Sequence, residues 1–208
     1  MKNFFVVNHP LVKRDLTILR DKNSNQEQFR NALRRVSLAM ALEISRDFSL
    51  IDFSIDTPLE TTIGYKLHKE ICLIPILRAG LSMLDGFLTV LPDASVGHIG
   101  IQRNETTLQP EDYYFKTPRN IGNMRPIILD PMLATGGSAS AAISFVKQKG
   151  AKDIILACVI AAPEGVKKLE EEHRDVKIFA AALDRQLNDK GYILPGLGDA
   201  GDRTFGTL

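Results

Sequence analysis

The stretch that decides the fold is "PIILDPMLATGGSASAAISF", residues 126–145. It begins as an apolar run typical of a buried strand and reaches one carboxylate, Asp130. After Thr-Gly-Gly-Ser at 135–138 it continues as an Ala-rich segment typical of a helix. In open α/β sheets, ligands bind beyond the carboxyl ends of the strands. We therefore predict a ligand site at this strand-to-helix turn.

The rest of the chain repeats this alternation of strand and helix. Further apolar runs predict buried strands at 70–77, 94–103, 153–162 and 176–183. Periodic or capped segments predict helices at 26–46, 78–91, 136–150 and 163–175. The stretch 47–60 favours an edge strand or a hairpin. The pattern predicts an α/β protein with an open, mostly parallel sheet flanked by helices, in one domain over 1–208.

Two segments interrupt the alternation. Residues 103–118 are polar and contain prolines and tyrosines, which favours a projecting β-arm or flexible loop over a site. The tail, 184–208, is rich in glycine and fits neither a strand nor a helix of the repeat. The first of these segments is therefore a candidate arm over a site.

Composition excludes several classes of function. The chain has 26 Lys and Arg against 25 Asp and Glu, a net charge of +1, which argues against general binding to nucleic acid or membrane surfaces. Cys72 and Cys158 lie in apolar runs, typical of reduced core residues. We find no signal peptide or membrane-length apolar segment and expect a cytoplasmic protein.

The turn at 135–138 suits a phosphate group. Gly136 and Gly137 allow the backbone to approach a ligand, and the start of the following helix offers unpaired N–H groups with partial positive charge. Thr135 and Ser138 add hydroxyl groups, and Asp130 can accept hydrogen bonds from neighbouring ligand hydroxyls. A phosphate beside a diol indicates a ribose phosphate, although Thr-Gly-Gly-Ser alone is also compatible with a simple helix cap.

Two better-known phosphate motifs fit poorly. The turn has no lysine, so it is not a Walker A loop. A G-x-G-x-x-G pattern occurs at 196–201, but the chain after it is too short for a helix and a return strand. We therefore reject a dinucleotide-binding interpretation.

Several segments, in order, resemble one family. The segments are "HPLVKRDLTILRD", "PILRAGLSMLDG", "IGIQRNETTLQPEDYYFKTP", "IILDPMLATGGS" and "GYILPGLGDAGDRTFGT". They resemble the phosphoribosyltransferases, and among these the branch that acts on uracil. The general family pattern has two adjacent acids at the strand end, whereas Pro131 follows Asp130 here, as in the uracil branch. The resemblance implies a pentosyltransferase that makes UMP and diphosphate from uracil and 5-phosphoribosyl diphosphate (PRPP), a reaction of UMP salvage.

The resemblance also implies which residues bind PRPP. The 5-phosphate would lie on 134–138, the ribose hydroxyls on Asp130, and the diphosphate near Arg78 and Arg103. The full set implied for PRPP is Arg78, Arg103, Asp130, Pro131, Met132, Leu133, Ala134, Thr135, Gly136, Gly137, Ser138 and Asp199. Of these, Asp199, Arg103 and Asp130 are the candidate catalytic residues.

The tail would recognise the base. Uracil presents an acceptor, a donor and an acceptor, which a backbone offering N–H, C=O and N–H complements. The resemblance assigns this role to Ile193, Gly198 and Ala200, with Asp199 beside them. We hypothesise that Asp199 also assists removal of the N1 proton, directly or through water.

Cofactors and partners are implied by the resemblance alone. Mg²⁺ is expected to be bound mainly through the diphosphate of PRPP, with no set of metal ligands from the protein. A homodimer or larger homo-oligomer and activation by GTP are also implied. Two alternatives remain open: a PRPP-sensing regulator that binds nucleic acid, and the same chemistry on another base.

Overall fold

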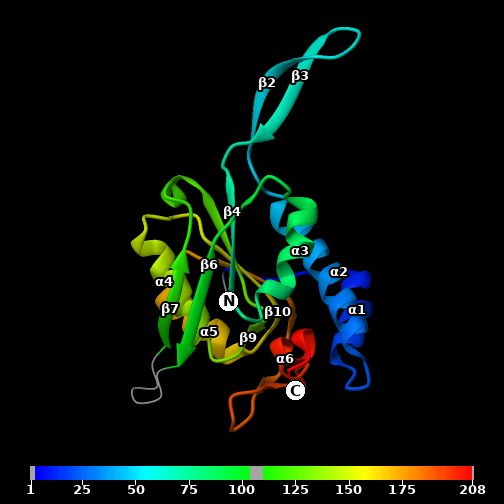
Figure 1. Cartoon of the computed structure of the whole chain (residues 1–208), viewed down its shortest axis with the longest axis vertical. Coiled ribbons are helices and arrows are strands. Elements are labelled where there is room, and N and C mark those ends of the chain that lie inside the picture. The colour runs from blue at the N-terminus through cyan, green and yellow to red at the C-terminus, as the bar shows by residue number, and fades with distance from the viewer. Residues whose placement is uncertain (1–2, 104–109, 208) are drawn as a thin grey trace.

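A mostly parallel sheet forms the centre of the computed structural model, which describes residues 3–103 and 110–207 (Figure 1). Its strand order is β1 (Phe4–Val6), β11 (Lys177–Leu183), β10 (Ile155–Ala161), β8 (Arg125–Leu129), β4 (Ile71–Leu77), β6 (His98–Arg103) and β7 (Pro110–Lys116). Short strands β5 (Ser95–Val96) and β9 (Met132–Leu133) pair with β4 and β10. Only β7 is antiparallel to its neighbour in this sheet as described. The predicted fold class is confirmed.

Helices cover both faces of the sheet (Figure 1). One face carries α1 (Pro10–Arg20), α2 (Gln26–Ser45) and α3 (Leu81–Val90). The other carries α4 (Gly137–Gln148) and α5 (Pro163–Glu172), with the 3₁₀ turn η1 (Ile121–Asn123). Each face has its own hydrophobic cluster, so the strands between them are apolar on both sides.

Local sequence explains the long elements. In α2, Phe29, Val36 and Met40 recur at helical spacing and are fully buried. The helix begins with a capping box in which Asn25 and Gln28 exchange hydrogen bonds through their side chains and backbone N–H groups. Strand β4 is buried from Ile71 to Ile76, as its continuous apolar run predicts.

The hairpin of β2 (Leu50–Asp56) and β3 (Thr61–Leu67) stands out from the body of the molecule. It confirms the hairpin alternative for 47–60, although its second strand lies beyond that stretch. Figure 1 places it at the end of the molecule opposite to the C-terminal segment. The hairpin is thus separate from the carboxyl ends of the parallel strands.

The expected arm at 103–118 is partly a paired strand. Strand β7 pairs with β6 from His98↔Lys116 to Arg103↔Pro110, with an irregularity after Gly100. The ring of Tyr113 packs on Gly100, where a methyl group would lie 2.4 Å from the ring. The β-arm alternative is therefore confirmed for 110–116, and residues 104–109 lie outside the described part.

The tail forms a small structure of its own. Strands β12 (Gln186–Leu187) and β13 (Ile193–Leu194) pair as a short hairpin, and α6 (Ala200–Phe205) follows. Both cysteines are buried and unpaired. Among the described helices, none combines the length and apolar character needed to cross a membrane. The expectation of one domain stays a prediction.

Candidate active site

Strands β4 and β8 lie side by side in the sheet, and the chain leaves them in opposite directions. After β4 the chain crosses to β6, and after β8 it crosses to β10. Such a switch point opens a crevice beyond the carboxyl ends of the two strands, where α/β proteins bind ligands. Arg78 follows β4 and Asp130 follows β8, so both lie at this crevice.

The turn before α4 has the geometry expected of a phosphate loop. Gly136 adopts a left-handed conformation with φ of 79°, and a methyl group there would lie 3.1 Å from the carbonyl oxygen of Gly165. No side chain caps the first N–H groups of α4. Thr135 and Ser138 are exposed. The loop can therefore offer backbone N–H groups and hydroxyls to an anion.

The residues just before this turn attach it to the sheet. The carbonyl oxygen of Pro131 accepts hydrogen bonds from the N–H groups of Val159 and Ile160, at 3.0 and 3.1 Å. The carbonyl oxygen of Leu133 accepts one from Ala162 N–H at 2.8 Å. Met132 and Ala134 are partly buried beside them. These four residues, each predicted to contact PRPP, lie just before the turn, where hydrogen bonds of their backbone fix the path of the chain.

Asp130 is partly buried at the end of β8. Its burial raises the pKa of the carboxyl group to about 6, and a hydrogen bond from Met132 N–H, at 3.3 Å, offsets part of that rise. The carboxyl group is thus ionised near neutral pH but takes up a proton in mildly acidic solution. A carboxylate with few other partners is suited to accept hydrogen bonds from a diol.

Arg78 reaches across the crevice to the tail. Its Nη2 donates to Oδ1 of Asp202 at 3.2 Å, and its Nη1 donates to Oγ1 of Thr207 at 3.4 Å. The side chain is 59% exposed, so the guanidinium group remains accessible to a ligand. Gly80, in the same turn, packs so closely that a methyl group would lie 2.3 Å from the carbonyl oxygen of Leu129. This contact joins the turn after β4 to the residue before Asp130.

Arg103 is the last residue of β6, and its backbone pairs with Pro110. Strand β6 neighbours β4, so this residue ends at the same edge of the sheet as Arg78. The side chain of Arg103 lies outside the described part of the structure. Its predicted role with diphosphate stays a prediction.

The tail lies beside the phosphate loop. A methyl group at Gly191 would lie 3.8 Å from Cγ2 of Thr135. Ile193 and Ala200 are buried, whereas Gly198 is exposed with φ of 79°. The structure therefore brings the predicted base-binding segment to the same crevice as the phosphate loop.

Asp199 caps the last helix. Its Oδ1 accepts a hydrogen bond from Asp202 N–H at 2.9 Å, and the residue is exposed. Gly201 lies two residues further along the chain, and a methyl group there would lie 4.0 Å from Nη2 of Arg78. Asp199 is thus on the wall of the crevice that Arg78 faces, and its role in proton removal stays a prediction.

Comparison with known proteins identifies the family. A sequence profile described as uracil phosphoribosyltransferase matches residues 6–207. The chain belongs to the uracil phosphoribosyltransferase family. It is 53% identical to the uracil phosphoribosyltransferase of Salinibacter ruber over 207 residues, which cover 100% of this chain and 99% of the relative. It is also 53% identical to that of Finegoldia magna over 208 residues, with 100% of both chains covered.

Two solved structures resemble the fold of this uracil phosphoribosyltransferase family member. A protein from Aquifex aeolicus matches with a TM-score of 0.92 and 39% identity, covering 97% of each chain. An adenine phosphoribosyltransferase from Trypanosoma brucei matches with a TM-score of 0.57 and 13% identity, covering 92% of this chain and 88% of the other. The second likeness concerns the fold alone.

Sequence reasoning missed three charged residues around the tail of this uracil phosphoribosyltransferase family member. Arg20 and Asp184 form a bidentate ion pair that contacts Gly196, and Arg203 donates to Leu197 O at 2.8 Å. Asp184 directly follows a buried apolar strand, as Asp130 does. This similarity could have identified Asp184 as a candidate residue from the sequence. Arg20 is 164 residues away from Asp184 in the chain and gave no such signal.

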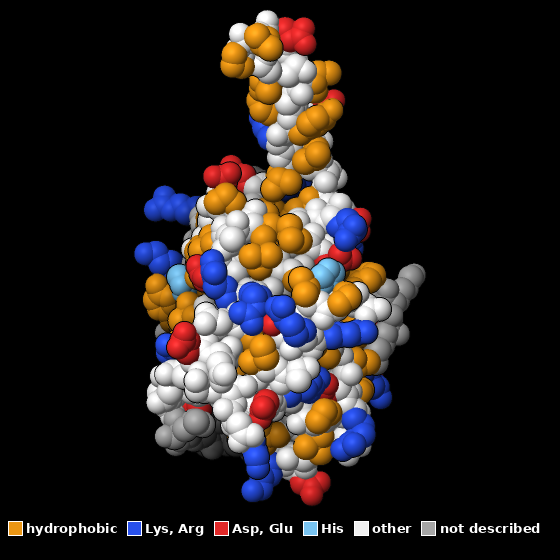
Figure 2. Space-filling model, turned by 90° about the vertical axis from the view of Figure 1, so that its right-hand side faces the viewer, with side chains coloured by type: hydrophobic (Ala, Val, Ile, Leu, Met, Phe, Trp, Pro, Cys, Tyr) orange, Lys and Arg blue, Asp and Glu red, His pale blue; other side chains and the backbone are white. Residues whose placement is uncertain are grey.

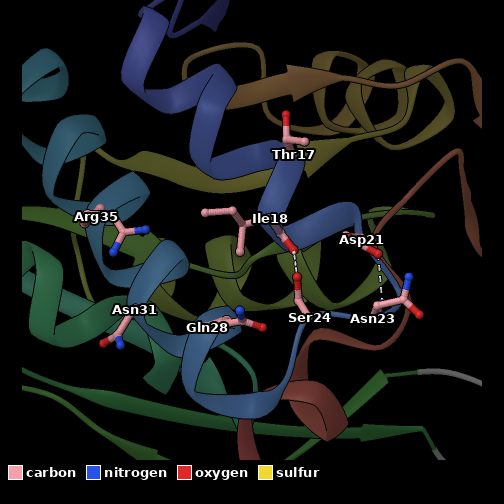
Figure 3. Close-up of a pocket in the computed structure, with 8 residues that line it drawn as sticks. All are labelled: Thr17, Ile18, Asp21, Asn23, Ser24, Gln28, Asn31 and Arg35. Atoms are coloured by element: carbon pink, nitrogen blue, oxygen red, sulfur yellow. Dashed lines mark hydrogen bonds between the residues drawn. The ribbon is translucent and has the colours of Figure 1, made fainter.

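A separate cavity lies where α1 meets α2 (Figure 3). It measures about 540 Å³, and none of the predicted site residues lines it. Its polar groups partly bond one another: Ser24 Oγ donates to Ile18 O at 2.6 Å, and Asn23 N–H donates to Oδ1 of Asp21 at 2.9 Å. This hollow therefore contributes nothing to the crevice beyond β4 and β8.

Asp130 is a carboxylate in the crevice that could contact a hydrated metal ion. Across 3–103 and 110–207, no three His, Cys, Asp or Glu side chains gather as a metal-binding group. Asp130 stands beside Pro131 rather than beside a second acid. The chemistry of these residues suits a Mg²⁺ ion held chiefly by diphosphate oxygens and water.

Proposed function

We propose that this chain transfers the 5-phosphoribosyl group of PRPP to N1 of uracil, giving UMP and diphosphate, with the residues around the β4–β8 crevice. The observation that carries the proposal is the meeting of three segments there. Gly80 contacts the end of β8, Arg78 reaches Asp202 at 3.2 Å, and Thr135 lies against Gly191. A phosphate loop, a guanidinium group and a glycine-rich tail thus share one site.

PRPP is held at both of its charged ends. The 5-phosphate binds to the N–H groups and hydroxyls at 134–138, as the left-handed Gly136 supports. The ribose hydroxyls donate to Asp130. The diphosphate, with its Mg²⁺, lies toward Arg78 and Arg103, whose guanidinium groups are permanently charged.

The reaction separates charge, and these residues stabilise both parts. As the bond from C1′ to diphosphate breaks, positive charge grows on the ribose and negative charge grows on the leaving group. Asp130, ionised above its pKa of about 6, stabilises the cationic ribose. Arg78 and Arg103 stabilise the diphosphate, whose negative charge Mg²⁺ also reduces.

The tail selects the base through its backbone. Ile193, Gly198 and Ala200 are the residues that we expect to offer N–H, C=O and N–H groups to uracil. Cytosine presents the opposite pattern at two positions, so it would leave buried groups without partners. We expect Asp199 to accept the N1 proton, directly or through water.

Turnover with different bases tests the proposal. The enzyme is incubated with PRPP, Mg²⁺ and one of uracil, cytosine, hypoxanthine or orotate, and nucleotide products are separated by chromatography. We expect UMP from uracil and no nucleotide from the other bases. Product from another base would overturn the assignment of the tail. Binding of PRPP without any product would favour a PRPP-sensing regulator.

We include a homo-oligomer in the proposal, and the β2–β3 hairpin supports it. Figure 2 shows apolar side chains over the projecting hairpin. Ile63 and Tyr65 are 62% and 63% exposed on one face, and Phe53 and Ile55 are 43% and 37% exposed on the other. An isolated hairpin is marginally stable in water, so two apolar faces favour burial against another copy of the chain.

Two further parts of the proposal concern the cellular location and activation by GTP. Two buried, unpaired cysteines are typical of a reducing compartment, which supports a cytoplasmic location. Activation by GTP rests on family resemblance alone. It is tested by measuring the rate of UMP formation with and without GTP, and an unchanged rate would contradict it.

A further inference from the structure

Asp184 is a buried carboxylate at the carboxyl end of β11, with 7% of its surface exposed. Its backbone N–H donates to Ala161 O at 2.8 Å, which fixes it to β10. Its side chain points into the tail and accepts hydrogen bonds from two different parts of the chain. A buried carboxylate is costly unless it is paired and hydrogen-bonded, so these contacts are needed.

The first partner is Arg20, the last residue of α1. Its Nη1 donates to Oδ2 of Asp184 at 2.8 Å, and its Nη2 donates to Oδ1 at 2.5 Å. The two residues are separated by 164 positions in the chain. Such a bidentate pair fixes orientation as well as distance, because both nitrogens and both oxygens are used.

The second partner is the backbone of Gly196. Its N–H donates to Oδ2 of Asp184 at 2.9 Å, and its carbonyl oxygen accepts from Nη1 of Arg20 at 2.9 Å. The ion pair therefore forms hydrogen bonds with both the N–H and the C=O group of Gly196. Gly196 has φ of 66°, and a methyl group there would lie 2.2 Å from Ile193 O, so the chain folds back on itself at this point.

The position of Gly196 connects the ion pair to the base. Ile193 precedes it and Gly198 follows it, and both are residues that we expect to contact uracil. A backbone that reads a base must have its N–H and C=O groups oriented before the base binds, or binding would have to order it. Neither Asp184 nor Arg20 belongs to the predicted contacts with either substrate.

We propose that the Asp184–Arg20 pair is a positioning device for base recognition, which fixes Gly196 so that the loop at 193–198 presents its backbone to uracil. This inference rests on the proposed function, because it assumes that the loop binds the base. Asp184 and Arg20 act through Gly196 and do not touch the reacting atoms. They therefore govern uracil binding and selectivity and leave PRPP binding largely intact.

The test compares Asp184→Asn and Arg20→Lys with the wild type, measuring KM separately for uracil and PRPP. Asn keeps the size of Asp184 but places an NH₂ donor against the donors of Arg20 or Gly196. Lys keeps the positive charge of Arg20 but cannot make the bidentate pair. We expect KM for uracil to rise about tenfold or more in Asp184→Asn and by less in Arg20→Lys, with KM for PRPP changed by less than about threefold. The ratio of kcat/KM for uracil over cytosine should fall in both variants.

A matched control is Asp153→Asn. Asp153 pairs with Arg125 at 2.6 Å, and Arg125 begins β8 at the other end of the sheet. This variant should lower thermal stability without changing either KM or the base preference. Equal changes in both KM values for Asp184→Asn, or the same profile in Asp153→Asn, would overturn the proposal in favour of a purely structural role.

The remaining outcomes are also decisive. If Asp184→Asn does not fold, Arg20→Lys carries the test, and an unchanged KM for uracil in it would overturn the proposal. If the wild type makes UMP but neither variant shifts KM for uracil, the positioning role fails while the proposed function stands. If the wild type makes no UMP from uracil, the proposed function fails and this inference fails with it.

Discussion

Arg78 donates a hydrogen bond from Nη2 to Oδ1 of Asp202, and so the turn after β4 is tied to the first turn of α6. Oδ1 of Asp202 also accepts a hydrogen bond from Thr207 Oγ1 at 2.6 Å. Without substrate, the guanidinium group thus has a carboxylate as its partner. A diphosphate entering the crevice would replace this partly buried carboxylate with a more highly charged partner.

Replacing Arg78 should therefore affect PRPP more than uracil. A charge-assisted hydrogen bond contributes about 1.5–3 kcal/mol, so Arg78→Gln should raise KM for PRPP by about 10- to 100-fold. Steady-state kinetics with each substrate varied in turn would measure this. Asp202→Asn is the comparison, and it should change KM by less than about fivefold because exposed ion pairs contribute little. An unchanged KM for PRPP in Arg78→Gln would remove Arg78 from the site.

The pKa of Asp130 predicts a conflict between stability and activity. The folded protein binds this proton more tightly than the unfolded chain, with a pKa of about 6 against the ordinary 3.8. Its contribution to stability is therefore present below about pH 4 and is lost as pH rises to about 6. At pH 8, Asp130→Asn should be more stable than the wild type by up to about 3 kcal/mol, and the difference should shrink at pH 4.

The same substitution should remove most of the activity, because Asn lacks the charge that stabilises the cationic ribose. Urea unfolding at both pH values and UMP formation at pH 8 would measure the two effects. The wild-type rate should also fall below about pH 6 as Asp130 takes up its proton. An Asp130→Asn variant that is active, or less stable at pH 8, would contradict this account.

Substitutions at Gly136 and Gly150 can separate the effect of backbone strain from the effect of losing phosphate binding. Both have positive φ, 79° and 90°. A methyl group at Gly136 would lie 3.1 Å from Gly165 O, whereas at Gly150 nothing comes closer than 3.9 Å. Gly136→Ala and Gly150→Ala should each destabilise the fold by about 1–2 kcal/mol. Only Gly136→Ala should also raise KM for PRPP, and an equal KM in the two variants would argue against phosphate binding at 134–138.

Charges on the hairpin should disrupt assembly without unfolding the chain. Ile63 and Tyr65 are largely exposed, so replacing both with Glu removes no core contacts. Sedimentation velocity should show a smaller particle for Ile63→Glu/Tyr65→Glu than for the wild type. Lys22→Glu, on the exposed turn between α1 and α2, is the control for added negative charge. The same particle size in all three proteins would exclude the hairpin as the contact between copies.

Local sequence was sufficient to predict the layered sheet. Strands β4 and β10 are continuous apolar runs, and α2 carries an apolar stripe. The burial of each element can therefore be predicted from its own residues. The turn at 135–138 was recognisable because its glycines closely follow an apolar strand that ends at Asp130, a pattern contained in neighbouring residues. These features need no knowledge of distant contacts.

The features that were missed depend on distant contacts. Strand β3 contains Gly64 and Lys66 and resembles a loop until it pairs with β2. At β7, which begins with Pro110 and two acids, the sequence favours either a β-arm or a loop, and only the pairing with β6 decides between them. Arg20 gives no local sign that it will meet Asp184, because only the folded α1 brings them together. Tertiary pairing overrode weak local preference at each of these places.

The β2–β3 hairpin and the α6 tail leave the sheet at opposite poles of the molecule (Figure 1). The amino ends of the strands thus carry the hairpin that we propose as a contact between copies, while their carboxyl ends carry the crevice. Amino-acid changes at one pole have no direct contact with the other. If copies associate through the hairpin as we propose, natural variation can alter that association while the chemistry stays the same, and a change of base preference need not disturb it.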